Sequence, residues 1–233
     1  MHFRGAILLV CAILTVWLMF TVVVARESEP QYAGRRLGDW LVQLHFTTGS
    51  QHDKAVEAVR AMGEETVPYL LSDVRYETTK LKMTLGAFAE RYHIRPVQLP
   101  RKWTEPRLEQ EMGVDGFCAL GDKGAGAIPS LALYLSNGPY HFHAASALAG
   151  IGPASIPALA NALHNPYQQA RFGAVVALGH LGPAARPALP ALLELYRQEP
   201  DMRTAITNEL VSIYEQALAR LPKYEPPAVA GAR

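Results

Sequence analysis

The sequence contains very little cysteine, which restricts the covalent links that it can form. Its two cysteines are Cys11 and Cys118. Cys11 lies in an apolar run near the N-terminus, whereas Cys118 lies in a segment with the pattern of a soluble helix. Geometry therefore argues against an intrachain disulfide between them. We expect Cys118 to be a small, buried, apolar residue.

An excess of charge of either sign is also missing. The 22 Lys and Arg residues nearly balance the 21 Asp and Glu residues, which gives a formal net charge of +1. A general nucleic-acid binder carries a strongly basic surface, so this class of protein is not expected. The chain also lacks a Gly-x-Ser-x-Gly elbow, a phosphate-binding glycine loop and a His-Glu-x-x-His helix, which are signatures of common enzymes.

Charged residues are absent from residues 5–24, a run that begins with Gly5 and ends with Val24. At about 1.5 Å per residue such a run forms a helix of about 30 Å, which matches the hydrocarbon thickness of a bilayer. We expect a cytoplasmic segment of residues 1–4, a single transmembrane anchor over residues 5–25, and the remaining chain on the exported side of a bacterial inner membrane. The alternative is a signal peptide cleaved after Ala25, which would leave a secreted or periplasmic protein.

Two stretches of the sequence are nearly the same. Residues 147–163 read ALAGIGPASIPALANAL and residues 177–193 read ALGHLGPAARPALPALL, with nine identical positions out of seventeen. A related stretch precedes them, and the three units align on Pro129, Pro157 and Pro187, which are spaced by 28 and 30 residues. A nearly fixed period of this length indicates repeated supersecondary units.

Each unit is predicted to be a pair of helices joined by a tight turn. The first helix is expected to end at a glycine such as Gly150 or Gly179, and the aligned proline is expected near the start of the second helix. Leucines of both helices recur at helical spacing and are expected to be buried: Leu120, Leu131, Leu135, Leu148, Leu159, Leu163, Leu178, Leu189 and Leu193. Because no single unit could bury such a face, the pattern predicts an all-α fold, a right-handed α-solenoid of helix pairs over residues 30–220.

The repeat pattern weakens on both sides of these units. A more degenerate unit comes first, with Gly63 in its turn and Pro68 at the start of its second helix. Residues 76–106 carry no repeat signature, and we interpret them as an insertion or a degenerate repeat. Near the end of the chain, an amphipathic helix with Ile206 on its inner face would close the stack. Residues 221–233 are expected to be a disordered tail.

The pattern R-x-x-A-x-x-A-L-G-x-L-G-P-x-A-x-P-A-L, at residues 171–189, resembles a HEAT repeat of the short phycobilisome-lyase type. The segment YAGRRLGDWL, at residues 32–41, is similar to the start of bacterial membrane-anchored HEAT-repeat proteins of unknown function. These resemblances cover most of residues 1–200 and imply an armadillo-type α-solenoid. They imply little about activity, because this architecture hosts scaffolds, adaptors, lyases and one hydroxylase.

Two enzymatic relatives can be compared with the chain. The HEAT-repeat hydroxylase binds iron through His-Glu dipeptides, but no histidine of this chain is followed by glutamate. A bilin lyase acts on cytoplasmic partners with attached chromophores, which an exported domain would not meet. The resemblance thus favours a non-catalytic scaffold that binds a protein through the curved surface of its second helices, without cofactor, metal or nucleic acid. The alternative is an enzyme of unrecognised, lyase-like type or an anionic-ligand binding module.

The tripeptide His141-Phe142-His143 is a candidate metal site. Two residues apart on a helix, the imidazoles point about 200° apart, and no Asp, Glu or Cys is adjacent. Phe142 aligns with Phe172 of the next unit, so we expect Phe142 in the core and both histidines at the surface. In the first soluble helix, Trp40 is expected to belong to an N-terminal cap, with a membrane or partner contact as the alternative.

The insertion carries a strong local charge. Residues 75–107 contain eight basic and three acidic residues, a net charge of +5. Within it, basic side chains are interleaved with aromatic ones at Arg91, Tyr92, Arg95, Arg101, Lys102 and Trp103. Such an arrangement can bind an anionic partner, here an acidic protein or a lipid headgroup. The alternative is a solvated loop with no binding role.

Overall fold

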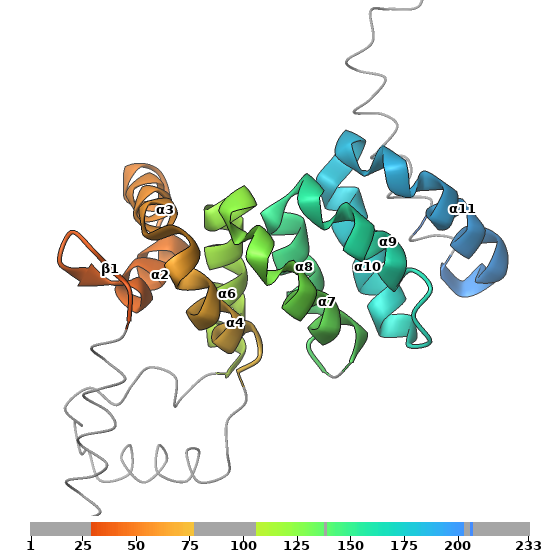
Figure 1. Cartoon of the computed structure of the whole chain (residues 1–233), viewed down its shortest axis with the longest axis horizontal. Coiled ribbons are helices and arrows are strands. Elements are labelled where there is room, and N and C mark those ends of the chain that lie inside the picture. Colours follow the sequence, from red (N-terminus) through yellow and green to blue (C-terminus); the bar gives the residue numbers. More distant parts are fainter. Residues whose placement is uncertain (1–28, 77–105, 138, 203–205, 207–233) are drawn as a thin grey trace, which may run out of the picture.

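The computed structural model describes residues 29–76, 106–137, 139–202 and 206. The expected anchor at residues 5–25, nearly all of the insertion and the expected tail lie outside the described residues. Within the described ranges the chain is mostly helical (Figure 1), which confirms the all-α class. None of the helices in these ranges is long and apolar enough to cross a membrane.

The described chain starts with a short antiparallel hairpin of β1 (Gln31–Tyr32) and β2 (Arg35–Arg36). The α-helices that follow are α2 (Leu37–Phe46), α3 (Ser50–Met62), α4 (Val67–Val74), α6 (Pro106–Leu120), α7 (Ile128–Ser136), α8 (His141–Ile151), α9 (Ile156–Ala162), α10 (Gln168–Leu181) and α11 (Leu189–Gln198). Short 3-10 segments are η1 (Gly63–Thr66), η3 (Gly121–Ala127), η4 (Pro153–Ser155), η5 (Gly182–Ala188) and η6 (Pro200–Met202).

The helices from α3 onward are arranged in pairs that follow one another along the long axis in Figure 1. A 3-10 segment joins the two helices of each pair: α3 to α4, α6 to α7, α8 to α9 and α10 to α11. First helices pack side by side, α6 against α8 and α8 against α10, while the second helix α7 packs against α9. Each pair therefore buries its inner face against its neighbours.

A glycine with positive φ follows the first helix of each described pair. These glycines are Gly63 (φ 63°), Gly121 (φ 62°), Gly152 (φ 99°) and Gly182 (φ 55°). A residue with a Cβ rarely adopts this conformation, so glycine is favoured where the chain leaves the helix. The expected helix ends at Gly150 and Gly179 are wrong, because both glycines lie inside helices, in α8 and α10.

Each second helix has a proline in its first turn. These prolines are Pro68 in α4, Pro129 in α7, Pro157 in α9 and Pro190 in α11. Proline costs no hydrogen bond there, because the first N–H groups of a helix have no acceptor within it. The alignment on Pro187 is wrong by three residues, since Pro187 lies in η5. The cause is the length of the 3-10 segment, which is seven residues in η5 and three in η4.

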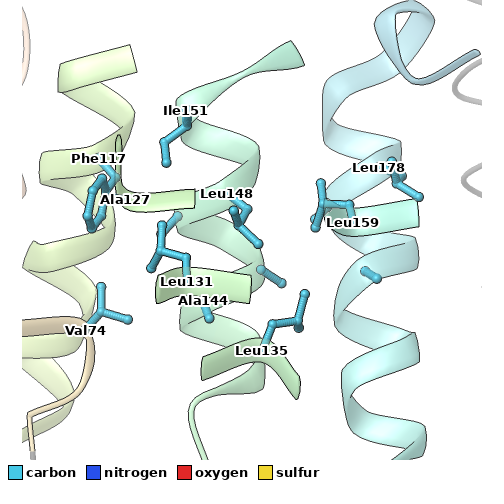
Figure 2. Packing of buried hydrophobic residues seen from close by; sticks show 14 of the residues in the cluster. Val74, Phe117, Ala127, Leu131, Leu135, Ala144, Leu148, Ile151, Leu159 and Leu178 are labelled. Atoms are coloured by element: carbon cyan, nitrogen blue, oxygen red, sulfur yellow. The ribbon is translucent and has the colours of Figure 1, made fainter. Parts of the chain in front are cut away.

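The start of α11 decides which of its leucines are buried. Leu192 is 0% exposed, whereas Leu193 is 42% exposed and Leu189 is only partly buried. The expected burial of Leu189 and Leu193 is therefore wrong. In the other units the expectation is confirmed, with at most 1% exposure for Leu120, Leu131, Leu135, Leu148, Leu159, Leu163 and Leu178. Figure 2 shows several of these leucines filling the space between neighbouring helices.

The helix α2 closes the N-terminal end of the described row. Trp40 is 7% exposed, and α2 packs against α3. The Nε1 atom of Trp40 donates a hydrogen bond to the carbonyl oxygen of Tyr32 (3.1 Å), and the Arg35 guanidinium lies 4.1 Å from the centre of the Trp40 ring. The expected N-terminal cap is confirmed. Toward the other end, Ile206 is 0% exposed, as expected.

Candidate interaction surface

The residues that the sequence indicated for partner binding lie outside the described residues. They are Arg91, Tyr92, Arg95, Arg101, Lys102 and Trp103. Their binding role stays a prediction. The described residues contain another surface feature, built on α8 and α10, that the sequence analysis did not identify.

Phe142 of α8 and Phe172 of α10 are both exposed, by 51% and 37%. The expectation that Phe142 lies in the core is therefore wrong. Phe142 shares its helix face with Ser146, four residues later, which is also exposed. The two phenylalanine rings meet edge to face, with their centres 5.9 Å apart and their planes at 74°. This geometry is favourable for an aromatic pair and holds both rings in place.

A shallow hollow of about 170 Å³ lies beside the two rings. It is lined by Phe142, Gln168, Gln169 and Phe172, and we call these four residues the aromatic shelf. Gln168 and Gln169 are the first two residues of α10 and are exposed. Neither side-chain amide forms a hydrogen bond with another described residue, so both can donate to and accept from a bound molecule.

The aromatic shelf adjoins a second pair of rings. Tyr167 precedes Gln168 and is 56% exposed, and its ring centre lies 6.4 Å from that of His141. The Nδ1 atom of His141 is 2.6 Å from the carbonyl oxygen of Leu135, which ties the start of α8 to α7. Exposed aromatic surface therefore spans the N-terminal ends of α8 and α10, and such surface is enriched at protein interfaces.

The loop that carries Tyr167 is fixed by Arg171. One guanidinium nitrogen, Nη1, donates to the carbonyl oxygens of Asn165 (2.8 Å) and Pro166 (3.0 Å). The other, Nη2, lies 3.0 Å from Oε1 of Glu199, and only 12% of the Arg171 side chain is exposed. The backbone N–H of Tyr167 donates to Oδ1 of Asn165 (2.9 Å). The loop at the rim of the aromatic shelf, which carries Tyr167, is thus held by hydrogen bonds and an ion pair within the protein.

The helices α7, α8 and α9 contain no formally charged residue. No Asp, Glu, Lys or Arg occurs between Lys123 and Arg171, a range that includes all of α7, α8 and α9 and the first turn of α10. In a chain with 18% charged residues, this gap is the sequence signal that could have indicated the surface. This signal was missed because Phe142 was expected to lie in the core.

The histidines of α8 are not grouped with other metal-binding side chains in the part of the chain that the structure describes. His143, expected at the surface, is only partly exposed. Burial lowers the pKa of His143; the Glu111 carboxylate opposes this shift, and the Arg107 guanidinium adds to it. Within residues 29–76, 106–137, 139–202 and 206, no group of three or more His, Cys, Asp or Glu residues is arranged to hold a metal ion.

A polar contact between side chains joins α2 to α6. The Nδ1 atom of His45 lies 2.7 Å from Oδ2 of Asp115. One turn further along α6, Cys118 is exposed rather than buried as expected. Desolvation where the thiol packs against α8 nevertheless raises the pKa of Cys118, and the Asp115 carboxylate raises it further. A protonated thiol is a poor nucleophile, so the chemistry of this group is that of a structural contact.

Two carboxylates are buried beside Tyr76. Asp73 of α4 is 3% exposed and Glu109 of α6 is 4% exposed. Burial raises the pKa of Tyr76, and the charges of Glu109 and Asp73 raise it further. The phenol therefore stays protonated at neutral pH. These groups lie where the chain enters residues 77–105, which are outside the described ranges.

No protein-family model matches this chain, and no curated protein matches it in sequence. The resemblance to HEAT repeats therefore stays a prediction, based on the pattern at residues 171–189.

Proposed function

We propose that this protein is a non-catalytic scaffold or adaptor that binds a protein partner. In this proposal the helix pairs belong to a HEAT-like α-solenoid. Residues 5–24 anchor it to a bacterial inner membrane, with the helix pairs on the exported side. The partner binds to an exposed surface of the row of helices, and no bond of the partner is made or broken.

The observation that carries the proposal is the exposed contact between Phe142 and Phe172. Full burial of one phenylalanine side chain contributes about 1.5–3 kcal/mol. Two such rings, held together beside a helix (α8) that contains no formally charged residue, offer a partner a favourable gain of buried apolar area. Enrichment in aromatic residues and depletion of charge are also the features that distinguish the centre of a protein interface from the remaining surface.

The arrangement of the helix pairs supports the α-solenoid part of the proposal. Each described pair has a glycine after its first helix and a proline at the start of its second, and each pair packs against the next. Stacks of this kind present long surfaces that commonly bind other proteins. The aromatic shelf belongs to the first helices α8 and α10, rather than to the second helices that the resemblance favours.

Photocrosslinking in native membranes tests the proposal. Tyr167→benzoylphenylalanine places the reactive group beside the aromatic shelf, and it should capture a protein that mass spectrometry identifies. His180→benzoylphenylalanine is the matched control, because His180 is exposed toward the C-terminal end of α10 and should capture much less. The captured protein, once purified, should bind the full-length chain saturably. A scaffold role is ruled out if no protein is captured from either position or from positions 92 and 103.

A further inference from the structure

We propose that the hairpin formed by β1 and β2 lies on the surface of the membrane that anchors the chain, where Arg35 and Arg36 bind the phosphate groups of phospholipids. This inference rests on the anchor of the proposed function and adds a second contact with the same membrane. Three observations carry it: the short connection between the anchor and the hairpin, two arginines without a carboxylate partner, and an exposed tyrosine beside them.

The short connection keeps the hairpin close to the membrane. Only residues 25–28 separate Val24, the last residue of the apolar run, from Glu29, the first described residue. An extended chain spans at most about 3.6 Å per residue, so Glu29 lies within about 18 Å of the end of the anchor. Glu29 is fixed to α2, because its Oε1 atom accepts a hydrogen bond from the backbone N–H of Gly38 (2.6 Å). The hairpin, at the end of the row opposite to α11 (Figure 1), is therefore held within reach of the headgroups.

Two adjacent arginines of the hairpin have no carboxylate partner. The exposed Arg35 donates a hydrogen bond from Nη1 to Oε1 of Gln43 (2.8 Å), and its guanidinium lies 4.1 Å from the centre of the Trp40 ring. These uncharged partners fix the position of the guanidinium and leave its charge uncompensated. The side chain of Arg36 forms no hydrogen bond or ion pair with another residue that the structure describes. Both charges are thus available to a bound anion.

The acidic residues near the hairpin do not neutralise these arginines. Glu29 lies at the N-terminus of α2, where the helix dipole favours a negative charge. Asp39 is exposed and forms no ion pair with either arginine. Arginine binds phosphate oxygens through parallel N–H bonds, and the anchor keeps phospholipid phosphates beside the hairpin at a high local concentration. A phospholipid is therefore favoured over an acidic protein that has to arrive by diffusion.

Tyr32 gives the hairpin an amphipathic side chain for the same surface. It is paired with Arg35 across the two strands, so the two side chains lie on one face of the hairpin. The Tyr32 ring is 37% exposed, and its centre lies 6.2 Å from that of the Trp40 ring. Tyrosine is enriched where a membrane meets water, because its ring packs against lipid while its hydroxyl stays hydrated. The turn residues Ala33 and Gly34 are small and exposed, so the tip of the hairpin can approach the headgroups closely.

The test is photocrosslinking of the full-length protein in vesicles of phosphatidylcholine and phosphatidylglycerol. Tyr32→benzoylphenylalanine should form an adduct whose mass is increased by that of one phospholipid. Leu193→benzoylphenylalanine is the matched control, because Leu193 is also exposed (42%) but lies on α11, and it should form almost no adduct. Addition of Arg36→Gln should lower the yield at position 32 about fivefold, as expected for the loss of one basic residue at an anionic surface. Arg197→Gln, at an exposed position of α11, should leave this yield unchanged.

Alkaline carbonate extraction of the same vesicles separates this inference from the anchor on which it rests. Protein that resists extraction but forms no lipid adduct at position 32, or forms it equally well with Arg36→Gln, overturns the hairpin contact and leaves the anchor standing. Protein that is released by extraction removes both. A crosslinked dimer in place of a lipid adduct would assign the hairpin to a second copy of the chain and also overturn the inference. The crosslink at position 167 tests the scaffold role independently of all these results.

Discussion

Gly150 of α8 lies directly against Cys118 of α6: a Cβ placed on Gly150 would be 2.6 Å from Sγ and 2.9 Å from Cα of Cys118. The two helices approach this closely only because Gly150 has no side chain. Gly150→Ala should therefore destabilise the protein by about 1–3 kcal/mol through overpacking, although alanine is the better helix former by about 1 kcal/mol. Urea unfolding at constant pH measures the difference.

Gly126→Ala is the control for this substitution. Gly126 lies in η3, has no positive φ, and a Cβ placed on it meets no heavy atom within 4 Å. This variant should be neutral or more stable by up to about 1 kcal/mol, because alanine restricts the unfolded chain. Equal stability of the two variants would show that α6 and α8 are not in close contact.

Leu192 and Leu193 are neighbours in α11, and their substitution tests which face of this helix is buried. Leu192→Ala should cost about 2–5 kcal/mol, as expected for the truncation of a buried leucine. Leu193→Ala should cost less than about 0.5 kcal/mol, because Leu193 is 42% exposed. Chemical denaturation of both variants measures the difference. If Leu193→Ala costs more stability than Leu192→Ala, the helix starts near Pro187 rather than near Pro190.

This register shows what the sequence could predict of the fold and what it could not. The helix pairs and most buried leucines follow from the repeated spacing of apolar residues, since that spacing decides which helix face can be buried. The dipeptides Gly182-Pro183 and Gly152-Pro153 are identical, but the 3-10 segments differ in length: η5 has seven residues and begins at Gly182, whereas η4 has three and begins after Gly152. Both Pro187 and Pro190 suit the start of a helix, so local preferences alone could not choose between them.

The aromatic shelf could not be found from hydrophobicity alone. Phe142 was expected in the core because it is apolar, yet the face of α8 that packs against α6 and α10 carries small residues such as Ala144 and Ala145. Phe142 does not lie on this face, so its ring is left exposed. Exposed Ser146, on the same face as Phe142, marks the outer side. The basic and aromatic residues of the insertion stay a separate prediction, outside the described residues.

Arg171→Lys should loosen the rim of the aromatic shelf. Lysine keeps the positive charge but cannot reproduce the separate bonds to Asn165, Pro166 and Glu199. We expect a loss of about 1–3 kcal/mol in stability and faster hydrogen exchange of the Tyr167 amide. Arg197→Lys, at an exposed position of α11, is the control and should change neither quantity. Unchanged exchange at Tyr167 in Arg171→Lys would contradict a supporting role for Arg171.

His143 should make the protein less stable in acid. Burial lowers the pKa of His143 in the folded state, so below about pH 6.5 the unfolded chain binds more protons than the folded chain at this site. Stability is therefore lost as the pH falls from about 6.5 through the lower folded pKa. His143→Gln should lose less stability than the wild type between pH 7.5 and pH 5, measured by urea unfolding.

Other groups also titrate in this range, so the difference between variants is the relevant quantity. His180→Gln removes an exposed histidine and should follow the wild-type pH dependence. Parallel curves for wild type and His143→Gln would show that His143 is solvated in the folded protein.

The membrane anchor is tested by topology. A fusion of alkaline phosphatase after residue 220 should be active, because this enzyme folds only on the oxidising, exported side of the membrane. The mature protein should keep residues 1–25, as read by mass spectrometry of its N-terminus. A mature N-terminus at Arg26 would instead establish cleavage after Ala25, and an inactive fusion would place the helices in the cytoplasm.

The row of helices also decides how the molecule opens. α8 packs against α6 on one side and α10 on the other. Opening of a helix pair at the end of such a row breaks one set of neighbour contacts, but opening at α8 breaks two. The amide hydrogens of α8 should therefore be among the last in the described row to exchange with solvent.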